Sequence, residues 1–129
     1  MQIKNTGRDA MMDALVDWLG LGCKLEIYTA AYGALLVEWS WGAGVKMYGN
    51  SASGVITLNT PAAETVAGVG AGNAAIAQIK SSGGTVMMKD FTVGVSSADF
   101  ILDNVSIEVG QNVTLLHASS TMTAPNPGF

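Results

Sequence analysis

The sequence predicts a mainly β protein, namely an antiparallel β-sandwich of the jelly-roll type with seven to nine strands and one N-terminal α-helix. Three observations support this prediction. Apolar and polar residues alternate through residues 85–116, which places one set of side chains in a core and the other in water. Turn-forming residues interrupt the chain about every eight to twelve residues, as in sandwiches. Only one segment has the apolar period of a helix.

The helix is expected over residues 8–19, after an N-terminal arm of residues 1–7 in which Asn5 or Thr6 is the N-cap. Gly20 and Gly22 end it, because glycine adopts the left-handed conformation of a C-cap. We expect this helix to cover one face or end of the sheet, while Trp18 is either part of that cover or an exposed anchor for a partner. The apolar stripe is Met11, Met12, Leu15, Val16 and Leu19, and a separate acidic face carries Asp9, Asp13 and Asp17.

Residues 24–122 are expected to form the sandwich. In the first strand, residues 24–29, we expect Leu25 and Ile27 to face inward and Glu26 to face water. The second strand, residues 34–41, carries four large apolar residues on one face, which indicates a core position, although the last of them lies where the strand ends. These four residues are Leu35, Val37, Trp39 and Trp41. Residues 45–48 predict a short edge strand and residues 55–59 a further strand.

Residues 60–73 are rich in alanine and glycine and predict a loop with a short extended piece near Val66. The glycine run at 68–72 is a weak candidate for a phosphate cradle, because a preceding strand, a following helix and a Lys-Ser/Thr pair are all missing. Residues 74–80 and 85–95 predict a hairpin, and residues 115–122 a last long strand. The tail, residues 123–129, contains two prolines and predicts an extended C-terminal arm. Residues 1–129 are expected to form a single domain.

Composition argues against several classes of function. The formal net charge is −4 and the six basic residues are scattered, so nucleic-acid binding is not expected. No apolar window approaches the length of a membrane span, and the charged N-terminal segment does not resemble a secretory signal, so we expect no membrane partner and synthesis in a cytoplasm. Only 12% of the residues are charged, which favours a protein that works in an assembly. Cys23 is expected to be a buried, inert thiol.

The residue types needed for catalysis or metal binding are scarce. One histidine, His117, and one cysteine cannot supply a zinc site, and no base is paired with a nucleophile, so we expect neither an enzyme nor a cofactor. Asp90, Asp99, Asp103 and Glu108 are candidate Ca²⁺ ligands, but solvated turn positions explain them better. An exposed aromatic patch for carbohydrate binding is a further hypothesis; its members are Tyr32, Trp39, Trp41 and Tyr48.

Five motifs, taken in order, resemble a family of small proteins encoded in the structural-gene regions of tailed bacteriophages and prophages. They cover nearly the whole chain: Asp13-Ala14-Leu15-Val16-Asp17, Leu25-Glu26-Ile27-Tyr28-Thr29, and residues 54–59, 93–103 and 107–114. Each motif alone is common among strands and turns, but five motifs in the same order indicate the family more specifically. The loop at 60–73 and the Trp39-Ser40-Trp41 segment depart from the family pattern, so the contact surface need not match that of relatives.

The resemblance implies a virion structural protein, of the capsid cement or decoration type, that binds the outer face of the major capsid shell. The implied partners are the major capsid protein of the same phage and further copies of this chain, which would form a homo-oligomer such as a trimer. The implied location is the capsid surface. The alternative is a carbohydrate- or receptor-binding module of the tail. Candidate contact residues are Trp18, Trp39, Trp41, Tyr48, Pro125 and Phe129. Both terminal arms are expected to order on neighbouring subunits.

Overall fold

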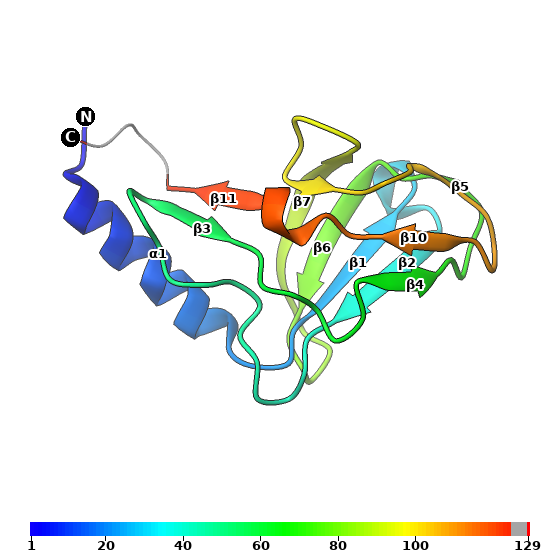
Figure 1. Ribbon diagram of the computed structural model, residues 1–129, viewed down its shortest axis with the longest axis horizontal. Coiled ribbons are helices and arrows are strands. Elements are labelled where there is room, and N and C mark those ends of the chain that lie inside the picture. Colours follow the sequence, from blue (N-terminus) through cyan, green and yellow to red (C-terminus); the bar gives the residue numbers. More distant parts are fainter. Residues whose placement is uncertain (125–128) are drawn as a thin grey trace.

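The computed structural model describes residues 1–124 and residue 129, and in this part of the chain the protein has one α-helix and eleven short strands (Figure 1). The mainly β class and the single N-terminal helix are confirmed. More strands are present than predicted because several are only two or three residues long. The elements are α1 (Asn5–Leu19), β1 (Lys24–Tyr28), β2 (Leu35–Ser40), β3 (Val55–Thr57), β4 (Thr65–Ala67), β5 (Gly72–Asn73), β6 (Ile76–Lys80), β7 (Val86–Gly94), β8 (Phe100–Ile101), β9 (Ser106–Ile107), β10 (Asn112–Thr114) and β11 (Thr121–Thr123), with 3-10 turns η1 (Ala30–Tyr32) and η2 (His117–Ser119).

The main layer is a curled five-stranded sheet in the order β2-β1-β6-β7-β8. Its pairs are antiparallel except β7–β8, which run parallel for two residues. The Asp99 carboxylate holds this short parallel connection, since it accepts hydrogen bonds from the backbone N–H and the hydroxyl of Thr92, at 2.9 and 3.1 Å. The inner face of the sheet carries the fully buried side chains of Leu25, Ile27, Trp39, Ala77 and Ile79.

Two two-stranded sheets, β10–β4 and β5–β9, form the second layer, and a third, β11–β3, lies between α1 and the main sheet (Figure 1). Figure 1 shows β10 and β4 in front of the main sheet. The space between the layers is filled by apolar side chains, and the rings of Phe91 and Phe100 meet edge to face at 5.1 Å. The arrangement is broadly that of a sandwich. The second layer contributes Ile107, Val113 and Leu115 to the core, and Ile56 of β3 joins the same core.

Helix α1 begins earlier than predicted. Lys4 is the N-cap, and its carbonyl accepts hydrogen bonds from the N–H groups of Gly7 and Arg8, so the first turn already forms at Asn5 and the N-terminal arm is shorter than residues 1–7. Gly20, with φ 77°, ends the helix as expected. The helix packs beside β3 rather than on the main sheet (Figure 1). Among the described residues no helix is long and apolar enough to cross a bilayer.

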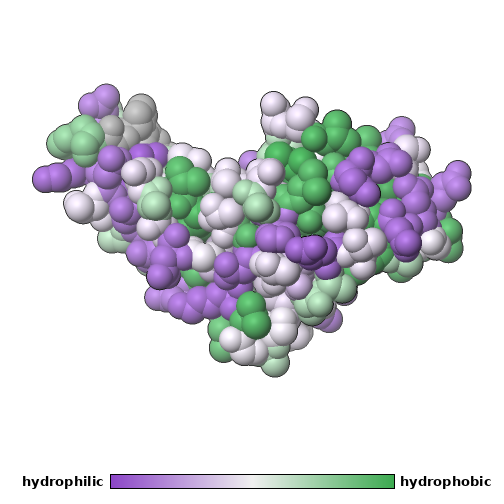
Figure 2. All heavy atoms as spheres, in the orientation of Figure 1, coloured by the Kyte–Doolittle hydropathy of each residue, from purple (hydrophilic) through white to green (hydrophobic). Residues whose placement is uncertain are grey.

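The acidic face of α1 is largely engaged. Asp9 accepts a hydrogen bond from the N–H of Gly54 at 2.6 Å, and Asp13 accepts one from the N–H of Ser51 at 2.8 Å. Arg8 is buried beside them and donates to the carbonyl oxygens of Ser53 (2.9 Å) and Ala124 (3.2 Å). Helix α1, the turn at 51–54 and strands β3 and β11 thus form an arm, and a V-shaped notch separates its end from the sandwich (Figure 2).

The segment predicted as one long strand, residues 115–122, is broken by η2. The Ser120 hydroxyl donates to the carbonyl of Leu116 at 3.0 Å, a local bond that competes with strand pairing. The predicted edge strand at 45–48 is reduced to two single bridges, and Thr123 of the predicted C-terminal arm belongs to β11. Pro125 and the rest of 125–128 lie outside the described residues.

Candidate functional site

Three of the candidate contact residues are buried, which corrects the prediction. Trp39 and Tyr48 are at most 2% exposed and Trp41 is 3% exposed. The segment after β3 covers the two indoles, whose N–H groups donate to the carbonyls of Glu64 (2.9 Å) and Asn59 (3.0 Å). These side chains stabilise the core, so the exposed aromatic patch proposed for carbohydrate binding does not form from them. Tyr32, its remaining member, is half-buried.

Two candidate contact residues are exposed. Trp18 is 56% exposed on the outer side of α1, and Phe129 is 68% exposed. The main-chain oxygen of Phe129 accepts a hydrogen bond from the N–H of Asn5 at 3.1 Å, at the first turn of α1. Trp18 is therefore available to a partner. Pro125, the sixth candidate, lies outside the described residues.

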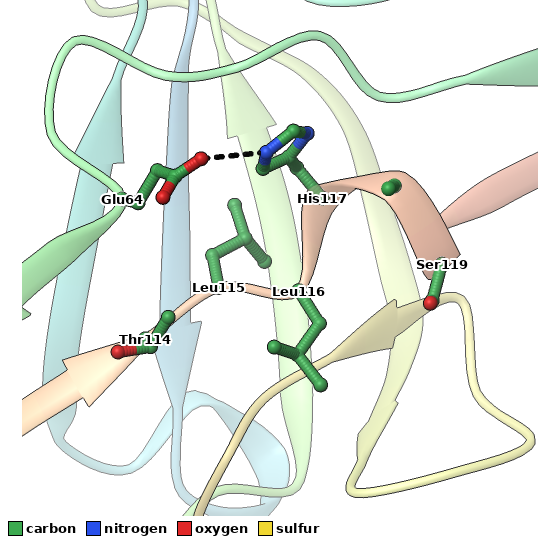
Figure 3. A pocket seen from close by; sticks show the side chains of 7 residues that line it. Glu64, Thr114, Leu115, Leu116, His117 and Ser119 are labelled. Atoms are coloured by element: carbon green, nitrogen blue, oxygen red, sulfur yellow. Dashed lines mark hydrogen bonds and ion pairs between the residues drawn. The ribbon is translucent and has the colours of Figure 1, made fainter.

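An open hollow of about 230 Å³ lies beside η2 (Figure 3). Its rim carries His117 and Glu64, joined by a 2.7 Å hydrogen bond between Nε2 and Oε1. Leu115 and Leu116 supply apolar lining, and the remaining lining residues are Thr114, Ala118 and Ser119. Sequence reasoning treated His117 as a lone residue, because nothing in the sequence signals its pairing with a loop residue 53 positions away.

The hollow lacks a nucleophile for the imidazole to activate. The Ser119 side chain points away from His117 (Figure 3), and the Thr114 hydroxyl shares a 2.7 Å hydrogen bond with the hydroxyl of Thr65. A base must lie within hydrogen-bond reach of the proton that it removes. Within the described residues, the His117–Glu64 pair therefore has no hydroxyl partner for acyl-transfer chemistry, and the hollow suits a small apolar group with one hydrogen-bonding atom.

The outer face of the main sheet carries a polar cluster around Glu26. Contrary to the prediction, this residue is only 5% exposed. Its Oε1 accepts hydrogen bonds from Gln78 (2.8 Å) and Tyr28 (3.0 Å) and lies 3.1 Å from Nζ of Lys80. The strand register places Gln78 on one side of Glu26 and Glu38 directly on the other. Neighbouring long side chains, rather than the core, bury the carboxylate.

The two carboxyl groups titrate differently. Burial raises the pKa of Glu26, but the hydrogen bonds from Gln78, Lys80 and Tyr28 outweigh burial and leave this pKa below its ordinary value. Burial, and next the adjacent Glu26, raise the pKa of Glu38. The cluster therefore holds one firmly ionised carboxylate beside one that ionises reluctantly. Alternation in the sequence could not reveal this pair, because it does not give the register between β1 and β2.

The other acidic candidates are dispersed. Asp99 binds Thr92, Asp103 accepts a hydrogen bond from the N–H of Thr114 at 2.9 Å, and Asp90 bonds to the Tyr32 hydroxyl at 3.0 Å. Across residues 1–124 and 129, no three His, Cys, Asp or Glu side chains gather as a metal site would require. Cys23 is fully buried, burial raises the pKa of its thiol, and the thiol donates to the carbonyl of Leu19.

The glycine run at 68–72 has a packing role. A Cβ on Gly68 would collide with the carbonyl oxygen of Glu108, and one on Gly70 with the carbonyl oxygen of Leu35. The N–H of Val69 between them donates to the carbonyl of Leu36 at 2.8 Å. The glycines therefore allow this loop to lie directly against the backbones of β2 and of residues 107–110, and close backbone approach explains them without a phosphate.

Comparison of the chain with family models, curated proteins and solved structures gives no match.

Proposed function

We propose that the chain is a non-enzymatic structural protein of a tailed-bacteriophage virion, a cement or decoration protein that binds the outer face of the major capsid shell. The five motifs in the family order support this proposal, as does the low fraction of charged residues. The burial of Trp39, Trp41 and Tyr48 removes the aromatic argument for the alternative, a carbohydrate-binding tail module. A ligand that prefers the assembled shell stabilises it by mass action.

The observation that carries the proposal is a pair of exposed valines on two hydrogen-bonded loops at the end of the sandwich. Val69 is 60% exposed, and Val109, which strict alternation placed in the core, is 71% exposed. Their loops lie against each other, since the N–H of Gly110 donates to the carbonyl of Gly68 at 2.8 Å. Gln111 bonds within its own loop, to the N–H of Glu108 and the carbonyl of Ser106. Exposed apolar side chains on a hydrogen-bonded support suit an interface anchor.

The test is co-sedimentation with DNA-free capsids of the phage that encodes the chain, together with the thermal stability of those capsids. Wild-type protein is expected to saturate the shell and raise its melting temperature. A V69E/V109E variant is expected to bind at least about tenfold more weakly, because a carboxylate at a desolvated anchor lacks a partner. The matched control V86E/V95E changes two exposed valines elsewhere on the molecule and is expected to bind normally. Absence of wild-type binding would overturn the proposal.

A further inference from the structure

The outer side of α1 carries an exposed apolar stripe that the fold does not use. The helix buries Met12, Val16 and Leu19 in the hydrophobic core, whereas Met11 and Trp18 point away from this core and are 44% and 56% exposed. Leu21 is also 47% exposed, but it lies beyond the Gly20 C-cap and outside the helix. The complete stripe on the helix is Gly7, Met11, Ala14 and Trp18.

The spacing of this stripe identifies the kind of element that fits it. Its members follow one another at alternating steps of four and three residues. Apolar residues that recur on average every 3.5 residues form a seam on the helix surface, and one helix packs along another through such a seam. A sheet or a flat surface would not require that period. The stripe runs the length of α1, which lies at the edge of the molecule with its outer side uncovered in Figure 1.

We propose that α1 of a second copy of this chain packs antiparallel on the stripe, about a twofold axis near the middle of the helix. In this register Trp18 lies opposite the partner's Gly7, beside the Ile3 side chain that lies next to this glycine, and Met11 lies opposite the partner's Ala14. Each large side chain therefore faces a small one, as knobs-into-holes packing requires. The twofold axis repeats the match, so both copies use the same patch and the dimer is closed. A parallel pair would instead set Trp18 against the partner's Trp18.

Charge complementarity favours the same orientation. Lys4 is exposed at the N-terminal end of the stripe, and the Asp17 side chain, paired with Lys46 at 2.6 Å, is still 69% exposed near the other end. Antiparallel packing brings Lys4 to the partner's last helical turn, where Asp17 and the negative end of the helix dipole attract a cation. Parallel packing would place Lys4 beside the partner's Lys4, and Asp17 beside the partner's Asp17.

The area predicts a reversible dimer. Covering the exposed parts of Met11, Trp18 and the adjacent Leu21 removes roughly 220–370 Å² of apolar surface per copy, given large side chains of about 150–250 Å². A standard interface buries about 800 Å² per partner, so these three residues supply about a quarter to nearly half of that area. We therefore expect a monomer–dimer equilibrium that depends on protein concentration.

Sedimentation equilibrium of the purified full chain over about 5 µM to 1 mM tests the proposal. The weight-average mass is expected to rise from 13.3 kDa toward twice that value. A14E places a carboxylate in the seam and is expected to raise the dissociation constant at least tenfold. T6E adds the same charge at an exposed helical position outside the stripe and is expected to leave the constant within about twofold.

A size swap tests the antiparallel register. M11A leaves alanine opposite alanine, and A14M sets methionine against methionine, so each single change is expected to weaken the dimer. The double variant M11A/A14M restores a large residue opposite a small one and is expected to recover wild-type association. Neither position lies on the buried side of α1, so the fold should tolerate all three variants. A monomeric wild type, an A14E dimer of normal strength or a double variant weaker than either single one would overturn the proposal.

Discussion

At the scale of single residues, Glu26 illustrates what alternation can and cannot predict. Its side chain points to the outer face of the sheet, as the pattern of β1 indicates, yet it is buried by the side chains around it. The period of a strand assigns a residue to a face but does not say which residues stand beside it on the adjacent strands. The Glu26–Glu38 pair follows from the register of β1 and β2, which only the folded chain supplies.

Neutralising Glu38 is expected to stabilise the protein at neutral pH. The pKa of Glu38 is raised in the folded state, so its ionisation favours the unfolded chain once the pH exceeds the unfolded value. E38Q removes a like charge directly opposite Glu26 and should raise the free energy of unfolding at pH 7 by about 0.5 kcal/mol. Urea unfolding between pH 3 and 8 measures the effect.

The gain from E38Q should shrink as the pH falls toward and below the ordinary glutamate value of about 4.3, because Glu38 is then protonated in both states. Glu26 has the opposite sign: its pKa is lowered, so its stabilisation holds at neutral pH and is lost on acidification. The control E108Q changes net charge equally at an exposed residue. A gain equal to that of E108Q, or independent of pH, would contradict the assignment.

At the scale of elements, the sequence located α1 and most strands, but not the partners of the shorter strands. The short extended piece near Val66 is predicted and is present as β4. Its pairing with β10 is not predicted, because it joins residues nearly fifty positions apart. The break at η2 was missed because local Ser120 bonding outcompetes an apolar run that looks like a strand. The sequence indicates only that the glycines at 68 and 70 lie in a loop. In the structure they allow close contact with the backbone carbonyls of Glu108 and Leu35.

Gly70→Ala is therefore expected to destabilise the fold by about 2–4 kcal/mol. The alanine methyl group would collide with the carbonyl oxygen of Leu35 in β2, and this edge strand cannot move away without losing its pairing with β1. Gly44→Ala is the matched control, because a Cβ there meets nothing within 4 Å. Equilibrium urea unfolding compares both variants with wild type. Equal stabilities of the two variants would show that the loop moves away from β2 freely.

At the scale of the whole molecule, the mainly β class and the terminal helix were predictable because they rest on periodicity. The division into a sandwich and an arm was not, because the arm joins the first helix, a turn in the middle of the chain and the last strand. Arg8 lies where these three meet and is 6% exposed. Nothing in the sequence indicates that an arginine in the first turn of a helix is buried, because most lysines and arginines are exposed.

Arg8→Met is expected to loosen the arm while the sandwich stays closed. The methionine keeps an apolar stem but leaves the carbonyls of Ser53 and Ala124 without their donor, and β3 and β11 alone offer three paired residues each. Hydrogen exchange should therefore accelerate at least tenfold in α1, β3 and β11 and stay unchanged in β1 and β6, as for a sub-global opening. Lys46→Met, which removes a largely exposed ion pair with Asp17, should change neither group. Acceleration spread evenly over arm and sheet would mean that the two parts open as one unit.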